Sequence, residues 1–552
     1  MAFVSNNGWI DGNSSDGVRL SLVEDFSDIY VYNLRGNLRT AGDVAKRDGG
    51  NVFDIRVGVQ VFFGIKKQSD EQCRIHYVET ADYMARDEKF DQLGNARIST
   101  MSWQAIQPNQ YGDWLNQRSE EFETWPVLGN KNNMQVKKFF ANYSGGLKTN
   151  RDAWVYNYSQ NDLKANISQT IQFYNSEVNR LTGLVEHGQS EVDARKEITF
   201  DKSKFAWDRV NKRNVVRGRY IEEHSDAYRA GLYRPFTKVH AYFDREQQLN
   251  NCTYQLPSMF PTPEHDNVGF IVEQSSGKLP FSVVATNHIF DLNFFSYPGQ
   301  FFPRWTWERV EVSDGELDLA LRQLSSASMK GREGEILSGY RRVDNVTDEI
   351  LAEYRSALGD VTKDDIFYFM YGQLHDPAYR AKYAADLKKM LPHIATPQSR
   401  ERFDRVAAAG RELMALHVGY EDVEPYPLNV QVKEGFSEDD RETWRVAKMK
   451  WAKRKDPETG KTVNDVTKLI YNTKVTISGI PAEAEEYMLG SRSALAWVID
   501  RYQVRPDKSS GIVNDPNDWA DEVGNPRYVV DLIGKVTRVA VGTVGIVRGL
   551  ED

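Results

Sequence analysis

Three hydrophobic runs open the chain and predict three strands of one sheet. They lie within residues 1–9, at Ile29–Leu34 and at Val57–Ile65. Each run is almost continuously apolar and is bounded by Asn, Gly or charged residues, which is typical of parallel strands buried on both faces of an α/β sheet. Between the first two runs, Ser15 offers a helix N-cap and apolar residues recur at one-turn spacing, so we expect a strand–helix–strand unit.

The first of these runs predicts a buried strand that starts at residue 2. A buried strand needs a neighbour on each side, and no earlier residue of the sequence can supply one of them. We therefore expect residues 1–70 to be the downstream remnant of a larger α/β sheet. We also expect the strand at Ala2–Ser5 to have an unpaired edge.

Residues 71–345 predict a connector followed by a mixed module. The connector, residues 71–130, contains a predicted strand at Cys73–Val78. Residues 131–345 combine short strands with one long amphipathic helix near Asn161–Leu181, which is typical of an α+β module.

From residue 346 to residue 552 the pattern is largely helical. Asp376-Pro377 and Thr396-Pro397 predict helix starts, because Pro is favoured at the first helical position. Near the end, Trp444–Lys453 and Lys468–Ser478 predict the two strands of a hairpin. A closing helix is expected at Val529–Leu550.

Composition indicates a globular protein and excludes several classes. Of 552 residues, 40% are hydrophobic and 27% charged, and the formal net charge is −9. We find no apolar run near the roughly 20 residues that span a bilayer and no signal peptide, so we expect a cytoplasmic protein without a membrane partner. Two cysteines, Cys73 and Cys252, support neither a disulfide framework nor a Cys-based zinc site. The nine histidines show no metal-ligand spacing.

The densest basic stretch of the sequence spans residues 202–219. Its cations alternate with aromatic residues, an arrangement that suits phosphates and bases of a nucleic acid. The candidates for DNA contact here are Lys212, Arg213, Arg217 and Arg219, and Arg234 prolongs the stretch. The alternative is that the charges form an ordinary solvated face.

The predicted hairpin near the C-terminus is a second basic candidate. Lys450 lies in its first strand among several Lys and Arg residues. A two-stranded ribbon can enter a major groove, which makes Lys450 a candidate DNA contact. The alternative is that Met449 and Trp451 face the core and the lysines protect an edge strand from aggregation.

Motifs spread over the whole chain resemble one enzyme family. Phe3–Trp9 and Ile29–Asn37 are similar to the back half of an adenine-N6 DNA methyltransferase domain. The likeness continues in Ser225–Tyr228, Tyr233–Phe236, Phe302–Trp305, Tyr371–Arg380, Ala409–Leu413, Leu416-His417, Ser478–Pro481 and Asn514–Trp519. Together these strings resemble the C-terminal portion of Type ISP restriction–modification enzymes, which join nuclease, helicase-like ATPase, coupler, methyltransferase and target recognition domains in one chain.

The resemblance implies an α/β fold in two parts. A partial Rossmann-like methyltransferase sheet, truncated at its N-terminus, would precede an α+β target recognition domain with a largely helical C-terminal part. The parent enzyme would use S-adenosylmethionine for methylation, and ATP with Mg²⁺ for translocation and cleavage. The family's Gly-rich cofactor turn and its Asn/Asp-Pro-Pro-aromatic tetrapeptide are absent from this sequence. We therefore expect this chain to be inactive without the missing N-terminal domains.

The resemblance also places two loops at the sheet edge that faces a flipped base. Asn6 and Asn7 in the first loop suit base edges, as does Asn37 in the second, and Arg35 and Arg39 suit phosphate. The alternative is that Asn and Gly only make turns there. Phe53, before the third strand, resembles the apolar residue that borders the adenine pocket, and core packing is its alternative.

The leading hypothesis is a segment that binds double-stranded DNA and supplies sequence specificity to a restriction–modification enzyme. A stand-alone RNA- or protein-binding module without enzymatic activity is the rival. A hydrolase is disfavoured, because the sequence contains no P-loop, Gly-x-Ser-x-Gly or His-Glu-x-x-His motif.

Overall fold

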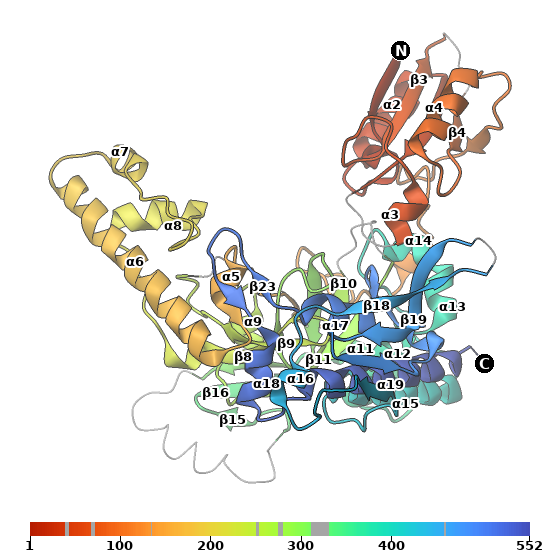
Figure 1. Cartoon of the computed structure of the whole chain (residues 1–552). Coiled ribbons are helices and arrows are strands. Elements are labelled where there is room, and N and C mark those ends of the chain that lie inside the picture. Colours follow the sequence, from red (N-terminus) through yellow and green to blue (C-terminus); the bar gives the residue numbers. More distant parts are fainter. Residues whose placement is uncertain are drawn as a thin grey trace.

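The computed structural model describes residues 1–38, 43–67, 72–133, 135–249, 253–273, 280–310, 331–457 and 460–551. The chain forms three parts, which we name the sheet unit (residues 1–115), the basic arm (residues 160–219) and the body (the remainder). The arm and the sheet unit rise from the same side of the body and stand apart from one another (Figure 1).

The sheet unit is a five-stranded mixed sheet with strand order β1-β3-β2-β4-β5. β3 is antiparallel to both β1 and β2, β4 is parallel to β2, and β5 is antiparallel to β4. The strands are β1 (Ala2–Asn6), β2 (Asp28–Arg35), β3 (Val59–Ile65), β4 (Arg74–Glu79) and β5 (Gln104–Ile106). The helices are α1 (Gly8–Asp11), α2 (Asp16–Asp25), α3 (Asp43–Asp48) and α4 (Arg86–Asn95).

The first strand differs from the sequence prediction. β1 is not a buried parallel strand, because it pairs antiparallel with β3 and Val4 is 51% exposed. Alternate residues face the core, and the ring of Phe3 stacks on that of Phe62 at 4.5 Å. The predicted unpaired edge is confirmed for the described residues, since β3 is the one strand with which β1 pairs.

The sheet also continues past the expected boundary at residue 70. The predicted strand at Cys73–Val78 is confirmed as β4, and β4 and β5 complete the same sheet. Trp114 is buried in the hydrophobic cluster under that sheet. The first part of the predicted connector therefore belongs to the sheet unit.

The basic arm is built on the long helix predicted near Asn161–Leu181. This helix, α6 (Gln160–Glu186), begins where the Ser159 hydroxyl accepts a hydrogen bond from the backbone N–H of Asp162. Its apolar face, including Ile167 and Tyr174, is buried. The arm is completed by α7 (Glu191–Lys196), α8 (Arg209–Asn214) and η2 (Val215–Arg217).

The body contains three small sheets before residue 345, which agrees with the mixed pattern predicted there. Their strand orders are β11-β10-β13-β6, β12-β8-β9-β7 and β14-β16-β15. The strands are β6 (Ser144–Gly145), β7 (Tyr156–Asn157), β8 (Tyr228–Arg234), β9 (Thr237–Tyr242), β10 (Gly269–Glu273), β11 (Val283–Thr286), β12 (Ile289–Phe290), β13 (Gly299–Pro303), β14 (Trp305–Arg309), β15 (Ile336–Leu337) and β16 (Tyr340–Asp344).

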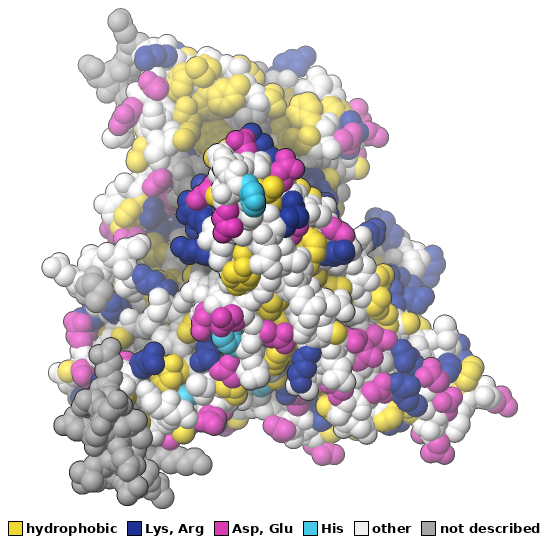
Figure 2. All heavy atoms as spheres, turned by 90° about the vertical axis from the view of Figure 1, so that its left-hand side faces the viewer, with side chains coloured by type: hydrophobic (Ala, Val, Ile, Leu, Met, Phe, Trp, Pro, Cys, Tyr) yellow, Lys and Arg dark blue, Asp and Glu magenta, His cyan; other side chains and the backbone are white. Residues whose placement is uncertain are grey.

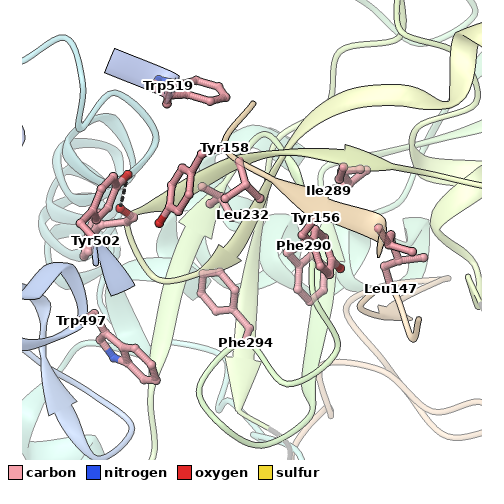
Figure 3. Close-up of a cluster of buried hydrophobic side chains, with 14 of the residues drawn as sticks. Leu147, Tyr156, Tyr158, Leu232, Ile289, Phe290, Phe294, Trp497, Tyr502 and Trp519 are labelled. Atoms are coloured by element: carbon pink, nitrogen blue, oxygen red, sulfur yellow. Dashed lines mark hydrogen bonds between the residues drawn. The ribbon is translucent and has the colours of Figure 1, made fainter. Parts of the chain in front are cut away.

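The main core joins these sheets to helices far along the chain. Figure 3 shows Tyr156 of β7, Leu232 of β8 and Phe290 of β12 in one buried cluster with Trp497 and Tyr502. Burial of such large rings is a major source of stability, at about 25 cal/mol per Å² of apolar surface removed from water.

The C-terminal half of the body is helical around the pair α12–α15. The backbones of these helices meet at Gly372 and Gly410, where a Cβ atom on either residue would collide with a carbonyl oxygen of the other helix. The helices are α11 (Asp348–Leu358), α12 (Lys363–Gln373), α13 (Pro377–Lys382), α14 (Ala384–Leu387), α15 (Arg400–Val418), α16 (Arg441–Trp444), α17 (Ala494–Arg501), α18 (Pro516–Glu522) and α19 (Tyr528–Arg548).

The predicted helix signals in this half are mostly confirmed. Asp376 caps α13 with Pro377 at its first position, and α19 matches the expected closing helix. Thr396-Pro397 does not begin a helix, because the Ser399 hydroxyl caps α15 three residues later. Among the described helices, none is both long enough and apolar enough to cross a bilayer.

The strands of the C-terminal hairpin have different bounds from those predicted. β18 (Lys450–Lys455) pairs with β19 (Thr462–Ile470), and the chain then turns into β20 (Val475–Ser478), which pairs with β17 (Asn429–Val432). Trp444 belongs to α16 instead of a strand. The remaining short elements are α5 (Asp152–Val155), α9 (Leu256–Met259), β21 (Met488–Leu489), β22 (Arg492–Ser493), β23 (Arg505–Pro506), β24 (Val513–Asn514), η1 (Phe122–Thr124), η3 (Ser225–Ala227) and η5 (Ala482–Glu486).

Candidate nucleic-acid interface

The loops after β1 and β2 lie at the same end of the sheet unit, because both strands run antiparallel to β3. Asn7 connects them: its side-chain amide donates to the Oδ1 atom of Asn33 at 2.9 Å, and its backbone N–H donates to the Gly58 carbonyl at 2.9 Å. Asn6 is exposed at the same edge. Asn7 therefore holds the loops together, while Asn6 is accessible to a ligand.

Arg35 is occupied by acidic neighbours. Its guanidinium contacts Asp48 and Asp82, and its side chain is 12% exposed. Burial by itself lowers the pKa of Arg35, but the hydrogen bond to Asp82 and the charges of Glu79 and Asp48 outweigh it and raise that pKa. Arg35 thus ties the strand-end loop to its neighbours, and a phosphate would have to displace these carboxylates.

Asn37 contacts Asp48, one of the two carboxylates that Arg35 contacts. Arg39 lies outside the described residues. The backbone N–H of Asn37 donates to Asp48 Oδ2 at 2.9 Å. The structure therefore assigns Asn37 a role in shaping the loop and provides no test of Arg39.

Phe53 is accessible at the same edge. Its side chain is 55% exposed, so the core-packing alternative for this residue is wrong. Asn51 fixes the loop beneath it, donating to the carbonyls of Gly36 at 2.8 Å and Val57 at 2.7 Å. The sequence did not single out Asn51, since one Asn in a polar loop carries no distinguishing pattern.

The basic arm carries exposed cations on α8 and η2. Arg213 and Arg219 are exposed and form no ion pair with a described side chain. Lys212 Nζ lies 4.9 Å from the centre of the Phe200 ring, and Arg217 is paired with Glu191 at 3.0 Å. Figure 2, which looks onto the tip of the arm, shows Lys and Arg side chains on both of its flanks.

Arg234 is removed from this surface by burial. It is 8% exposed, its guanidinium lies 2.6 Å from the Asp291 carboxylate, and it stacks over the Tyr233 ring at 4.0 Å. The prediction that Arg234 reaches DNA is therefore not supported, because its guanidinium is engaged by Asp291 inside the body.

Lys450 is exposed on β18, an edge strand of the sheet β17-β20-β19-β18. Met449 is buried and Trp451 packs against the core, as the edge-strand alternative requires. Figure 1 places β18 on the side of the body away from α8. The structure does not bring Lys450 together with the basic arm.

One polar hollow of about 340 Å³ was missed by sequence reasoning. It is lined by residues 147–150, Asp152 and residues 291–293. These segments lie more than 100 positions apart in the sequence, so no local pattern could have joined them. Among the described residues, no group of three His, Cys, Asp or Glu side chains is arranged to hold a metal ion.

Comparison with known proteins identifies the family. Residues 138–532 match the model of the Type ISP C-terminal specificity domain. A nuclease-deletion mutant of the Type ISP restriction–modification enzyme LlaGI, solved with a DNA substrate mimic, is 31% identical with a TM-score of 0.80. The ATP-dependent Type ISP enzyme LlaBIII bound to DNA is 30% identical with a TM-score of 0.81, and the DrdV–DNA complex is 30% identical with a TM-score of 0.79.

These solved relatives are longer than the chain. The likeness covers 100%, 100% and 99% of this chain, but 46%, 32% and 50% of the LlaGI, LlaBIII and DrdV chains. No curated protein gives a significant match. The match over residues 138–532, with relatives at least 30% identical over the full chain, shows that the chain belongs to the Type ISP C-terminal specificity domain family.

Proposed function

We propose that this chain is the segment of a Type ISP restriction–modification enzyme that binds duplex DNA and selects its target sequence. The observation that carries the proposal is the family match combined with structural likeness, over the whole chain, to enzymes solved in complex with DNA. The rival function, a stand-alone RNA- or protein-binding module, has no support among these comparisons.

The duplex would lie between the basic arm and the strand ends of the sheet unit. Both parts rise from the same side of the body (Figure 1). Lys212, Arg213 and Arg219 would neutralise phosphates on one side of the duplex, because none of them has to leave a described acidic partner in order to bind a phosphate. Asn6 and Phe53 of the sheet unit would face the opposite side of the duplex, where a base is flipped out of the DNA stack.

The methyl-transfer chemistry would belong to the remainder of a longer enzyme. The residues of this chain do not fit S-adenosylmethionine, because the sequence has neither the Gly-rich turn nor the Pro-Pro tetrapeptide. ATP and Mg²⁺ would likewise act on domains other than this one. The edge of β1 that pairs with no described strand, and the half-exposed Val4 within β1, suit pairing with a further strand of such an enzyme.

Salt dependence of binding to duplex DNA tests this function. The purified chain is titrated with a labelled duplex pool and with a single-stranded RNA pool between 50 and 200 mM salt. We expect duplex affinity to fall by at least ~10-fold over that range, because counterions released from phosphates dominate the free energy. Affinity that does not depend on salt, or tighter binding of the RNA pool, contradicts the proposal.

A further inference from the structure

The polar hollow of about 340 Å³ presents three side chains with unused hydrogen-bonding groups. Lys148, Asn150 and Asn293 are exposed, and none of their side chains forms a hydrogen bond or ion pair with a described residue. Exposed polar side chains often point freely into solvent. These three side chains differ, because they surround one concave site and are carried by two loops whose backbones are hydrogen-bonded to each other.

The two loops that carry them are bonded to each other. Leu147 donates to the Phe290 carbonyl at 2.8 Å, and Leu292 donates to the Leu147 carbonyl at 3.0 Å. Gly146 lies so close to the backbone of Asp291 that a Cβ atom there would collide with it. The relative position of the two loops is therefore set by direct backbone contact.

Two carboxylates, the buried Asp291 and the half-buried Asp152, then set the direction of each loop. Asp291 Oδ1 accepts from the backbone N–H of Asn293 at 2.9 Å and also pairs with Arg234. On the other loop, Asp152 accepts from the Thr149 hydroxyl, which in turn accepts from the backbone N–H of Arg151 at 3.1 Å. Both carboxylates at the back of the hollow are thus engaged, and their charge disfavours a phosphate inside it.

Asn150 itself has a backbone φ of +53°, in the left-handed region that Asn tolerates better than most residues. Non-Gly residues in such a conformation concentrate at binding sites, where the surrounding structure holds them. Here the holding residue is the neighbouring Arg151, which is buried and hydrogen-bonded through its Nη2 atom.

Arg151 also connects the hollow to the basic arm. Its Nη2 atom donates to Asn211 Oδ1 at 2.6 Å and to the Ala206 carbonyl at 3.1 Å, and it pairs with Asp208, the N-cap of α8. Lys212 and Arg213 directly follow Asn211 on that helix. A duplex whose phosphates meet α8 would therefore pass close to the hollow.

We propose that Asn150, Asn293 and Lys148 contact base edges in the major groove and set part of the target sequence. This inference rests on the proposed DNA-binding function and assigns it specificity-determining residues. An Asn amide offers one donor and one acceptor, which match N7 and the N6 amine of adenine, and a Lys ammonium matches O6 and N7 of guanine. The recognised site accordingly contains adenine opposite one or both Asn residues and guanine opposite Lys148.

The test is selection of the full chain against a randomised duplex pool, followed by sequencing of the bound fraction. The variants are Asn150→Gly, Asn293→Ala and Lys148→Ala. Asn150→Gly keeps the left-handed backbone while removing the amide, so it should fold normally. Asn429→Ala, at an exposed residue of β17 that lies outside both the basic arm and the hollow, is the matched control.

We expect wild type and Asn429→Ala to select the same motif. Each hollow variant should lose preference at one position by roughly 5- to 150-fold and keep it elsewhere. Asn293→Asp should change the preferred base at its position to cytosine, whose N4 amine donates to a carboxylate. A residue with a merely structural role would not produce this exchange.

Two results overturn the inference in distinguishable ways. If wild type selects a motif and all hollow variants select the same motif with the same strength, base contact by the hollow is wrong and the DNA-binding function stands. If wild type selects no motif at all, the proposed function itself fails.

Discussion

The ammonium of Lys389 lies 2.8 Å from the carboxylate of Asp113, and both side chains are almost completely buried. Asp113 belongs to the sheet unit and Lys389 to the body, just after α14. Arg118 and Arg19 contact the same carboxylate at 2.8 and 3.6 Å. This cluster fixes the sheet unit to the body, and with it the position of the strand ends relative to the basic arm.

Replacing Asp113 should destabilise the protein strongly. Asp113→Asn leaves buried cations without their counter-charge, and breaking a buried pair in this way costs about 3–5 kcal/mol. Chemical denaturation at pH 7 measures the free energy of unfolding. Lys196→Ala, which removes the exposed pair with Asp193, is the control and should cost less than about 1 kcal/mol. Equal effects of the two variants would mean that the cluster does not hold the parts together.

Asp291 should make stability depend on pH near neutrality. Burial raises its pKa to about 6, and the Arg234 guanidinium opposes this rise without cancelling it. A carboxyl whose pKa is higher in the folded than in the unfolded state contributes stability that is present below about pH 4. That contribution is lost as the pH rises through 6.

The Asp291→Asn variant isolates this effect. Between pH 4.5 and 7.5 the wild-type free energy of unfolding should fall relative to that of Asp291→Asn by about 2 kcal/mol, which is the part of the effect of the raised pKa that falls within this pH range. Denaturant titrations at both pH values measure the difference. Asp193→Asn, at an exposed position, should follow wild type. Parallel curves for wild type and Asp291→Asn would contradict the assigned pKa.

The cations of α8 should account for part of the salt dependence of DNA binding. Lys212→Ala and Arg213→Ala should each lower the slope of log affinity against log salt by about one, and should weaken all sequences alike. Lys450→Ala is the control, because this lysine is exposed on β18, which lies away from α8 (Figure 1). A larger change in slope for Lys450→Ala than for Lys212→Ala would place the DNA on the hairpin instead.

The chain should bind no S-adenosylmethionine. Purified protein is mixed with the labelled cofactor and its selected duplex, and incorporation into DNA is counted alongside calorimetry of cofactor binding. We expect neither signal, since the family's cofactor turn and tetrapeptide are absent from the sequence. Methylated adenine in the product would mean that the active site has been misplaced.

Periodicity predicted the long elements well and the strand neighbours poorly. The long helix near Asn161–Leu181 and the closing helix matched α6 and α19, because many repeats of an apolar face leave little ambiguity. The sequence places the first strand in the sheet interior, because a short apolar run has the same pattern in an edge strand and in a buried strand. The position of β1 in the sheet is decided by its pairing with β3, some 55 residues later in the sequence, so no local pattern could show it.

The candidate site was only partly visible in the sequence. The exposed cations Arg213 and Arg219 belonged to a dense basic stretch that was recognisable. Arg234 looked equivalent to them, but its counter-charge Asp291 lies 57 residues away and decides its burial. The hollow had no sequence signal, because the bridge between Leu147 and Asp291 that forms it joins two segments far apart in the sequence.

Photo-crosslinking from defined positions tests most directly whether DNA lies between the arm and the sheet unit. A photoreactive residue is placed singly at Asn6, Asn150 and Lys212, and at Asn429 of β17 as the control, and each protein is irradiated with the same selected duplex. The account predicts crosslinks from the first three positions and none from Asn429. Crosslinks from Asn429 together with none from Asn6, Asn150 and Lys212 would contradict it.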